Sequence, residues 1–263
     1  MLMLGSCGTT SKVPITGRKQ RLSVSDEQIL SLSASQYKQY LASAKKSTNA
    51  ANTAMVQRVG QNLANAVVSY LNNNGYAHEV KNYAWEFNLV QNNSVNAFCM
   101  PGGKIVVYEG MLPVTQDEAS LAIVLGHEIA HAVAKHSAEQ MSKQNNQSLL
   151  ASIGTSILGA KLGQNAADLA SSVASTGLTF LNAHYSRDNE SEADHMGLIF
   201  AAMAGYNPNT ALTFWQRMSQ ASSGGGQSGG LQSYLSSHPS DTKRVSDIKK
   251  WLPEAMKYYN AGK

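Results

Sequence analysis

Two histidines one helical turn apart are the first residues of this chain with a recognisable chemistry. Residues 125–131 read Leu-Gly-His-Glu-Ile-Ala-His, so His127, Glu128 and His131 form an H-E-x-x-H pattern. Side chains four positions apart lie on one face of a helix, and both imidazoles can therefore reach one metal ion. Glu128 is rotated by about 100° from His127 around such a helix and can contact water at the metal without binding the metal. The pattern predicts a catalytic zinc site.

A catalytic zinc ion needs a third protein ligand and one open position. Glu190 and Asp194 lie one helical turn apart, so Glu190 can reach the metal while Asp194 bonds the outer nitrogen of a ligand histidine and fixes its tautomer. The alternative is that this acidic run is only a solvated helix face. The role of His238 stays open at this point. The other candidates after His131 are expected to be structural or to face away from the metal: His136, His184, Glu192 and His195.

The elements that must position these residues follow from hydrophobic periodicity. Apolar spacings of three and four predict a mostly helical chain, and one alternating region predicts a small antiparallel sheet beside the H-E-x-x-H helix. We therefore expect an α+β fold. Helices are predicted at residues 26–46, 48–71, 116–143, 147–160, 165–183, 187–204, 209–220 and from 239 to just before 253, and strands at 84–90, 95–100 and 104–108.

Composition excludes several classes of function. The chain has 263 residues, 43% of them hydrophobic, and a net charge of +4. Its 21 lysines and arginines are scattered, whereas a nucleic-acid surface needs clustered positive charge. Two cysteines are too few for a cysteine-based zinc finger. We expect no nucleic-acid partner.

The N-terminus suggests a lipid anchor. Leu4-Gly5-Ser6-Cys7 follows apolar residues and resembles a lipoprotein processing box, with Cys7 as the acylated residue; an accidental cysteine is the alternative. We expect residues 1–24 to be a signal remnant and tether, and residues 25–263 to be a single metallopeptidase domain. This interpretation predicts a bacterial cell-envelope protein that faces the periplasm and is bound through its lipid to a membrane, which we expect to be the outer membrane.

The chain as a whole resembles the HtpX, Oma and CAAX-prenyl-endopeptidase family of gluzincins, and within it the soluble lipoproteins of the LoiP and BepA type. The matching motifs span roughly residues 95–245. They are Asn96-Ala97-Phe98, Pro101-Gly102-Gly103-Lys104-Ile105, Gly126-His127-Glu128-Ile129-Ala130-His131, Tyr185-Ser186-Arg187, Glu190 with Ala193-Asp194, and Ser237-His238-Pro239 with Arg244.

The resemblance implies a zincin-like fold with one zinc ion held by His127, His131 and Glu190. It further implies that Glu128 is the general base acting on water at the zinc. It places Asp194 behind a ligand histidine. We expect Arg244 to be an ion-pair partner around the site, with an ordinary surface charge as the alternative. His238 would lie on a loop over the zinc and could occupy its fourth position; the alternative is that His238 caps the following helix. His238, Tyr185 and Arg244 are the candidate donors to the oxyanion.

The resemblance also implies a mode of substrate binding. An edge strand at residues 104–108 would pair with extended substrate backbone, a form of recognition with low sequence specificity. We expect an endopeptidase acting on unfolded or misfolded cell-envelope proteins. The alternative is a non-proteolytic zinc-containing chaperone or assembly scaffold held shut by His238. The predicted substrate-binding residues are Asn96, Ala97, Phe98, Lys104, Ile105 and Val106.

Overall fold

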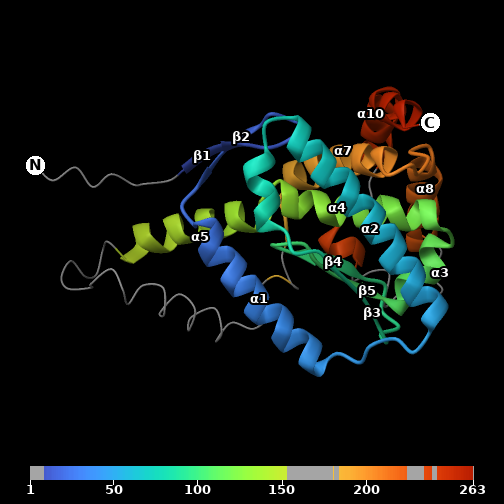
Figure 1. The fold of residues 1–263 in the computed structure, drawn as a ribbon, viewed down its shortest axis with the longest axis horizontal. Coiled ribbons are helices and arrows are strands. Elements are labelled where there is room, and N and C mark those ends of the chain that lie inside the picture. The colour runs from blue at the N-terminus through green and yellow to red at the C-terminus, as the bar shows by residue number, and fades with distance from the viewer. Residues whose placement is uncertain (1–8, 153–179, 181–183, 224–233, 239–241, 263) are drawn as a thin grey trace, which may run out of the picture.

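The computed structural model describes residues 9–152, 180, 184–223, 234–238 and 242–262. Within these residues, helix α4 (Glu118–Val133) runs through the centre, with a small sheet on one side and helix α7 (Arg187–Met203) on the other (Figure 1). Helices α10 (Thr242–Ala261) and α8 (Thr210–Ser223) pack beyond α7 and α4. The α+β, mostly helical fold predicted from sequence is confirmed.

The sheet has three strands in the order β3 (Glu86–Val90), β5 (Lys104–Tyr108), β4 (Ala97–Met100). The turn at residues 101–103 makes β4 and β5 an antiparallel pair, whereas β3 joins the other side of β5 in parallel. The sheet is therefore mixed and not wholly antiparallel. The difference arises because β3 pairs with β5, two strands later in the chain, and not with its neighbour in sequence.

This strand order corrects one predicted site. Strand β5 is central, so β3 and β4 already occupy both sides of its backbone. Ile105 and Val106 are fully buried, and the Lys104 ammonium group bonds Glu86. The prediction that residues 104–106 pair with substrate is wrong for this reason. Strand β4, which packs against α4, is the edge strand of the described sheet on that side.

The N-terminal helices have the caps that their sequences favour. Helix α1 (Asp26–Ser43) begins with a capping box, in which the Ser25 side chain accepts from the backbone of Gln28 and the Gln28 side chain accepts in return. Helix α2 (Ala50–Asn73) is capped by Asn49 and buries one apolar stripe against α4 and β3. A short helical turn, η1 (Ala77–Asn82), leads from α2 to β3, and two more, η2 (Glu109–Met111) and α3 (Leu112–Thr115), lead from β5 to α4.

The predicted single helix over residues 116–143 is two helices. Helix α4 ends at Val133, and α5 (His136–Ser152) begins three residues later. Lys135, at the break, has a φ of 57°, in the left-handed region that ends helices. Its ammonium group is held there by Asp26 and Glu79. The break turns His136 back towards His131.

The C-terminal helix also differs from the prediction. Helix α10 continues through Pro253 to Ala261 instead of ending before the proline. A proline inside a helix removes one backbone hydrogen bond. Ala255 beyond the proline is fully buried, and α10 packs along α7, so tertiary packing outweighs that loss. The predicted helices at 147–160 and 165–183 lie largely outside the described residues.

Residues 9–24, which we expected to be a tether, are packed against the domain. Strands β1 (Thr9–Lys12) and β2 (Lys19–Leu22) form an antiparallel hairpin beside α5, seen at the upper left in Figure 1. Val13 is fully buried in the main core. The backbone amides of Ser23 and Val24 donate to the Ser142 hydroxyl of α5. The hairpin is therefore part of the folded structure.

Two glycines set the separation of α4 and α7. A Cβ added at Gly126 would lie 2.6 Å from the Gly197 carbonyl oxygen, and one added at Gly197 would lie 2.6 Å from the His127 backbone nitrogen. Real Cβ atoms do not approach backbone so closely, and neither backbone can yield within a helix. The two helices cross here at the shortest separation that their backbones allow, directly beside His127.

We expect Gly126→Ala to lower the free energy of unfolding by about 3 kcal/mol, the upper part of the usual cost of overpacking. It should also lower metal affinity, because moving α7 away from α4 moves Glu190 away from both histidines. Thermal unfolding and metal titration would measure the two effects. Gly262→Ala is the control, since the nearest atoms to its added Cβ lie 3.9 Å away. Equal stability of both variants would contradict the proposed role of this crossing.

Candidate metal centre

Four side chains converge where α4 crosses α7. His127 and His131 come from α4, Glu190 from α7, and His238 from the segment before α10. One potential ligand atom from each lies within 4.8 Å of all the others. Glu190 is central: its carboxylate lies 3.4 Å from His127 Nε2, 3.3 Å from His131 Nε2 and 3.0 Å from His238 Nδ1. The structure thus brings the predicted ligand residues together.

A carboxylate behind His127 fixes its ring. Asp194 Oδ1 lies 2.8 Å from His127 Nδ1, so this nitrogen carries the proton and Nε2 presents its lone pair to the cluster. Arg244 holds Asp194 with two bonds of 2.6 Å, from Nε and Nη2. Its guanidinium group stacks over Trp215, with 3.6 Å to the ring centroid. Asp194 therefore lies behind a ligand histidine, and Arg244 forms an ion pair with Asp194.

His131 is held by two residues to which the sequence assigned no such role. The Tyr185 ring stacks on the His131 ring at 4.1 Å, and the Tyr185 hydroxyl bonds Ser137. His136 Nδ1 lies 2.8 Å from His131 Nδ1. We expected His136 to point to another face, because a continuous helix would place it there; the break at Lys135 reverses that. No sequence signal marked this break, because the residue that ends the helix is Lys135 and not a glycine or a proline.

The remaining candidates lie away from the cluster. His184 is exposed at the surface, and His195 stacks on Trp251 and bonds Glu254. Cys99 is buried in β4, as expected for a small apolar side chain. Glu192 faces away from Glu190, as predicted, but it bonds His136 and is not solvated.

Glu128 is buried beside the ligands without binding to them. Its side chain lies 3.6 Å from His238 Nε2, and Oε1 has no hydrogen-bond partner among the described residues. Burial raises the pKa of Glu128, and His238 and His127 partly offset this. A buried carboxylate of raised pKa is suited to accept and return a proton.

The cluster has the charge pattern of a cation site. His127 Nε2 and His131 Nε2 lie 3.1 Å apart, and both also face Glu190. Two lone pairs and a carboxylate repel one another unless a proton or a metal lies among them. Burial lowers the pKa of His127, but Glu190 and Asp194 together raise it to about 10, while burial lowers the pKa of His131. Without metal a proton takes this position, so metal binding must release it.

These residues fit a divalent metal. The donor set of two histidines and one glutamate is that of a catalytic zinc site, and Glu190 Oε1 is buried without a hydrogen-bond partner within the described structure. His238 supplies a fourth donor. The cluster is also closed, because these side chains are all buried: His127, Glu128, His131, Glu190 and His238. A cavity of about 210 Å³ between α7 and α10 is lined in part by Glu190, Asp194 and Arg244, but by none of the three histidines.

Comparison with known proteins agrees with this geometry. The model of peptidase family M48 matches residues 50–252, which include all four converging residues. The chain belongs to peptidase family M48. The resemblance inferred from sequence motifs is therefore confirmed. Membership of this family implies a divalent metal, and the cluster on α4 and α7 offers donor groups for one.

Several M48 relatives are named metalloendopeptidases. The chain is 40% identical to the mitochondrial metalloendopeptidase OMA1 of Schizosaccharomyces pombe over 65% of this chain and 48% of that protein. It is 30% identical to the human mitochondrial metalloendopeptidase OMA1 over 93% of this chain and 46% of that protein. The putative beta-barrel assembly-enhancing protease of Vibrio cholerae is 31% identical over 57% of this chain and 32% of that protein. The M48 chain thus spans half or less of these relatives.

The relatives overturn the predicted location. Proteins named as mitochondrial from yeasts, a plant and mammals match this M48 chain, so the prediction of a bacterial, periplasm-facing lipoprotein is wrong. That prediction rested on a short apolar segment before Cys7, and Cys7 lies outside the described residues. No helix among the described residues combines the length and apolar character of a membrane-spanning segment.

Proposed function

We propose that this M48 chain is a zinc-dependent endopeptidase that cuts unfolded or extended polypeptides. The observation that carries the proposal is the juxtaposition of a His-His-Glu donor set with a second carboxylate, Glu128, that is buried, lacks a hydrogen-bond partner among the described residues and is not a ligand. A structural zinc site needs no such group. The named activity of the M48 relatives supports the same conclusion.

The chemistry divides among named residues. His127, His131 and Glu190 would hold zinc, which when bound polarises the scissile carbonyl and lowers the pKa of water. Glu128 accepts a proton from the attacking water and delivers it to the leaving amine. Asp194 keeps the proton of His127 on Nδ1, so that Nε2 remains a ligand.

Among the candidate oxyanion donors, the contacts favour His238. The Tyr185 hydroxyl is committed to Ser137, and the Arg244 guanidinium group is committed to Asp194. The His238 ring lies 5.1 Å from the His127 ring, on the side of Glu128. It can donate to an oxyanion once it no longer faces the metal position.

Strand β4 is the proposed substrate-pairing strand. It packs against α4 and forms ladder bonds only to β5 within the described sheet. Backbone of residues 96–98 would pair with extended substrate, which recognises conformation more than sequence. Asn96, Ala97 and Phe98 thus keep their proposed role, although the Phe98 side chain packs on Tyr40 and serves the core.

Removal of metal tests the proposal. We expect a chelator to stop digestion of unfolded casein, and stoichiometric zinc to restore it, because zinc both polarises the carbonyl and lowers the pKa of the attacking water. The cleavage products would be identified by mass spectrometry, and the bound metal would be measured on the same sample. Digestion that continues at full rate after the metal has been removed would contradict the proposal.

The closed site favours a second candidate, a zinc-containing chaperone or assembly scaffold held shut by His238. His238 Nδ1 lies 3.0 Å from Glu190 Oε2, and Arg244 donates to the His238 carbonyl at 3.3 Å while it also bonds Asp194. The His238 ring also packs on the buried Tyr234, at 4.7 Å. These contacts hold the segment over the metal position, where it excludes substrate.

If His238 mainly holds the site shut, His238→Ala should retain zinc and cleave casein about 10-fold faster or more, since an open minor state is typically populated at about 0.1–10%. Zinc analysis and initial rates, with Ser237→Ala as the neighbouring control, would measure this. A slower rate would instead identify His238 as an oxyanion donor. Full zinc with no cleavage by either protein would support the scaffold.

A further inference from the structure

The N-terminal hairpin reaches the metal centre through a chain of polar contacts. Thr16 and Arg18 lie in the loop that joins β1 and β2, far in sequence from the ligands. The Thr16 hydroxyl donates to Glu192 Oε1 at 2.5 Å, and Arg18 Nε donates to Glu192 Oε2 at 2.8 Å. Glu192 Oε2 also lies 3.0 Å from His136 Nε2, and His136 Nδ1 lies 2.8 Å from His131 Nδ1.

The proton positions in this chain follow from its two ends. His131 must keep Nε2 free for the metal, so its proton lies on Nδ1 and is donated to His136. His136 then accepts at Nδ1 and carries its own proton on Nε2, which it donates to the Glu192 carboxylate. Each hydrogen bond from His131 through His136 to Glu192 then has one donor and one acceptor. The orientation of the ligand ring therefore depends on where Glu192 is held.

Arg18 is the group that holds Glu192. The Glu192 side chain is only 6% exposed, and a buried carboxylate needs a countercharge. Arg18 supplies it and at the same time forms two parallel bonds to Glu139, at 3.1 and 2.9 Å. Asn189 of α7 donates to Glu139 as well. The guanidinium group thus ties the hairpin to α5 and α7 at one point, a geometry that a lysine cannot reproduce.

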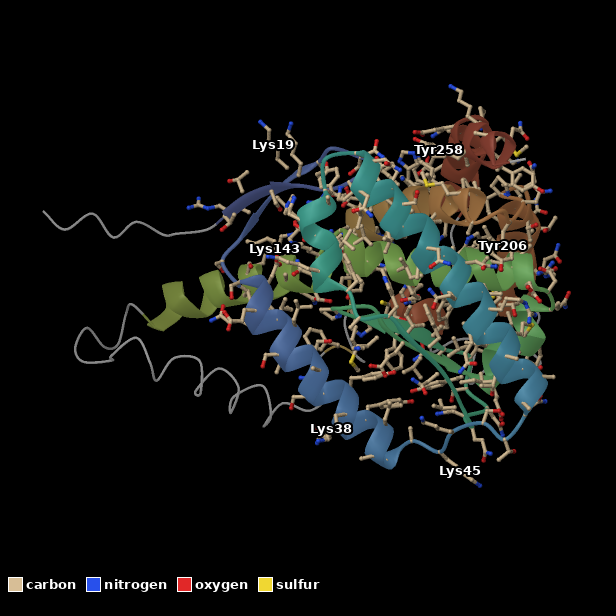
Figure 2. The ribbon with its side chains drawn as sticks, viewed as in Figure 1. Lys19, Lys38, Lys45, Lys143, Tyr206 and Tyr258 are labelled. Carbon is tan, nitrogen blue, oxygen red and sulfur yellow. The ribbon has the colours of Figure 1, made fainter. Side chains whose placement is uncertain are left out.

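The loop itself is built to present Arg18. Val13 N donates to the Arg18 carbonyl at 2.8 Å, and Gly17 N donates to the Val13 carbonyl at 2.9 Å. Ile15 has a φ of 65°, a left-handed conformation that costs free energy for a β-branched residue. The buried Val13 and the Glu192 contacts on either side keep it there. The neighbouring Lys19 is exposed, and Figure 2 shows it pointing away from the protein.

We propose that Arg18 is a positioning residue for the metal site, acting through Glu192 and His136 on the ring of the ligand His131. The proposal rests on the metal site of the proposed function but not on proteolysis. Loss of Arg18 leaves Glu192 without its cationic partner, and His136 and His131 then lose their fixed orientation. Changes in such outer hydrogen-bond partners typically cost about 10–100-fold in metal affinity.

The test measures zinc affinity of the full chain by competition with a chromophoric chelator. We expect Arg18→Ala to raise the Kd for zinc by about 10-fold, Arg18→Lys to raise it less, and Lys19→Ala to leave it unchanged. The visible spectrum of the Co²⁺-substituted protein should also change in Arg18→Ala, because it reports ligand geometry directly. Stability alone would not move that spectrum.

A milder variant covers the case in which Arg18→Ala does not fold. Thr16→Val keeps the shape of the side chain and removes only one donor to Glu192, so it should weaken zinc binding in the same direction by a smaller factor. Wild-type zinc affinity and an unchanged Co²⁺ spectrum in folded Arg18→Ala, or in Thr16→Val if only that variant folds, would overturn the proposal. Absence of zinc binding by the wild-type protein would instead overturn the proposed function.

Discussion

Glu128→Gln should abolish most cleavage while leaving the metal in place. Glutamine keeps the shape of the side chain but cannot accept a proton from water. Cleavage should fall by roughly 10²–10⁴-fold, the usual contribution of a positioned general base, or about 3–5 kcal/mol in the barrier. Zinc content should stay at the wild-type level, because Glu128 is not among the residues that converge on the metal.

The decisive comparison is the rate of casein cleavage by both proteins at matched zinc occupancy. The variant should still bind extended polypeptide, because backbone pairing at β4 does not involve Glu128, and it should therefore retain uncut substrate. Glu118→Gln is a matched control, since this carboxylate lies on the same helix and pairs with Arg58 at the surface. Equal rates for wild type and Glu128→Gln would exclude the proposed mechanism.

Replacement of Glu190 should have the second largest effect, and the structure changes what is expected of it. Three ligands alone would leave no reserve, but His238 offers a fourth donor 3.0 Å from Glu190. Glu190→Ala can therefore keep a weaker site of three histidines, with affinity lower by on the order of 10²–10³-fold if the binding free energy is shared among four ligands. The double variant Glu190→Ala/His238→Ala should lose zinc completely.

Metal analysis of both variants and of His238→Ala, after dialysis against a weak chelator, would measure this. Asp188→Ala is the control, because that carboxylate is exposed on the first turn of the same helix. Wild-type affinity in Glu190→Ala would show that another group is the third ligand. Complete loss in Glu190→Ala alone would show that His238 does not bind the metal.

The sequence predicted the parts of the site that depend on local geometry. The spacing of His127 and His131 and of Glu190 and Asp194 is one helical turn in each case, and both pairs lie on helices as expected. Family motifs indicated His238 and Arg244, and the structure brings both to the cluster. The three predicted ligands could be placed together because they lie on two regular elements, α4 and α7.

The sequence did not predict what depends on breaks and long-range pairing. A lysine in the left-handed conformation at residue 135 carries no sequence signature, so the reversal of His136 towards His131 was missed. Whether a strand is central or at the edge of a sheet depends on which other strands pair with it. The sequence does not show this pairing, so residues 104–106 were wrongly predicted to lie on an edge strand. Arg18 is an ordinary basic residue in a polar segment until the fold places two buried carboxylates beside it.

The close crossing of α4 and α7 has a consequence for how much of this protein a cell would contain. His127 and Asp194 lie 67 positions apart, so a metal held between their helices acts as a removable cross-link across a long segment of chain. Metal at 1,000 times its Kd stabilises the folded state by about 4.1 kcal/mol, a large share of the total stability of a typical domain. When metal is scarce, the unfolded fraction should rise, and unfolded chains are the form that cellular proteases remove. Metal supply would then set the abundance of the protein as well as its activity.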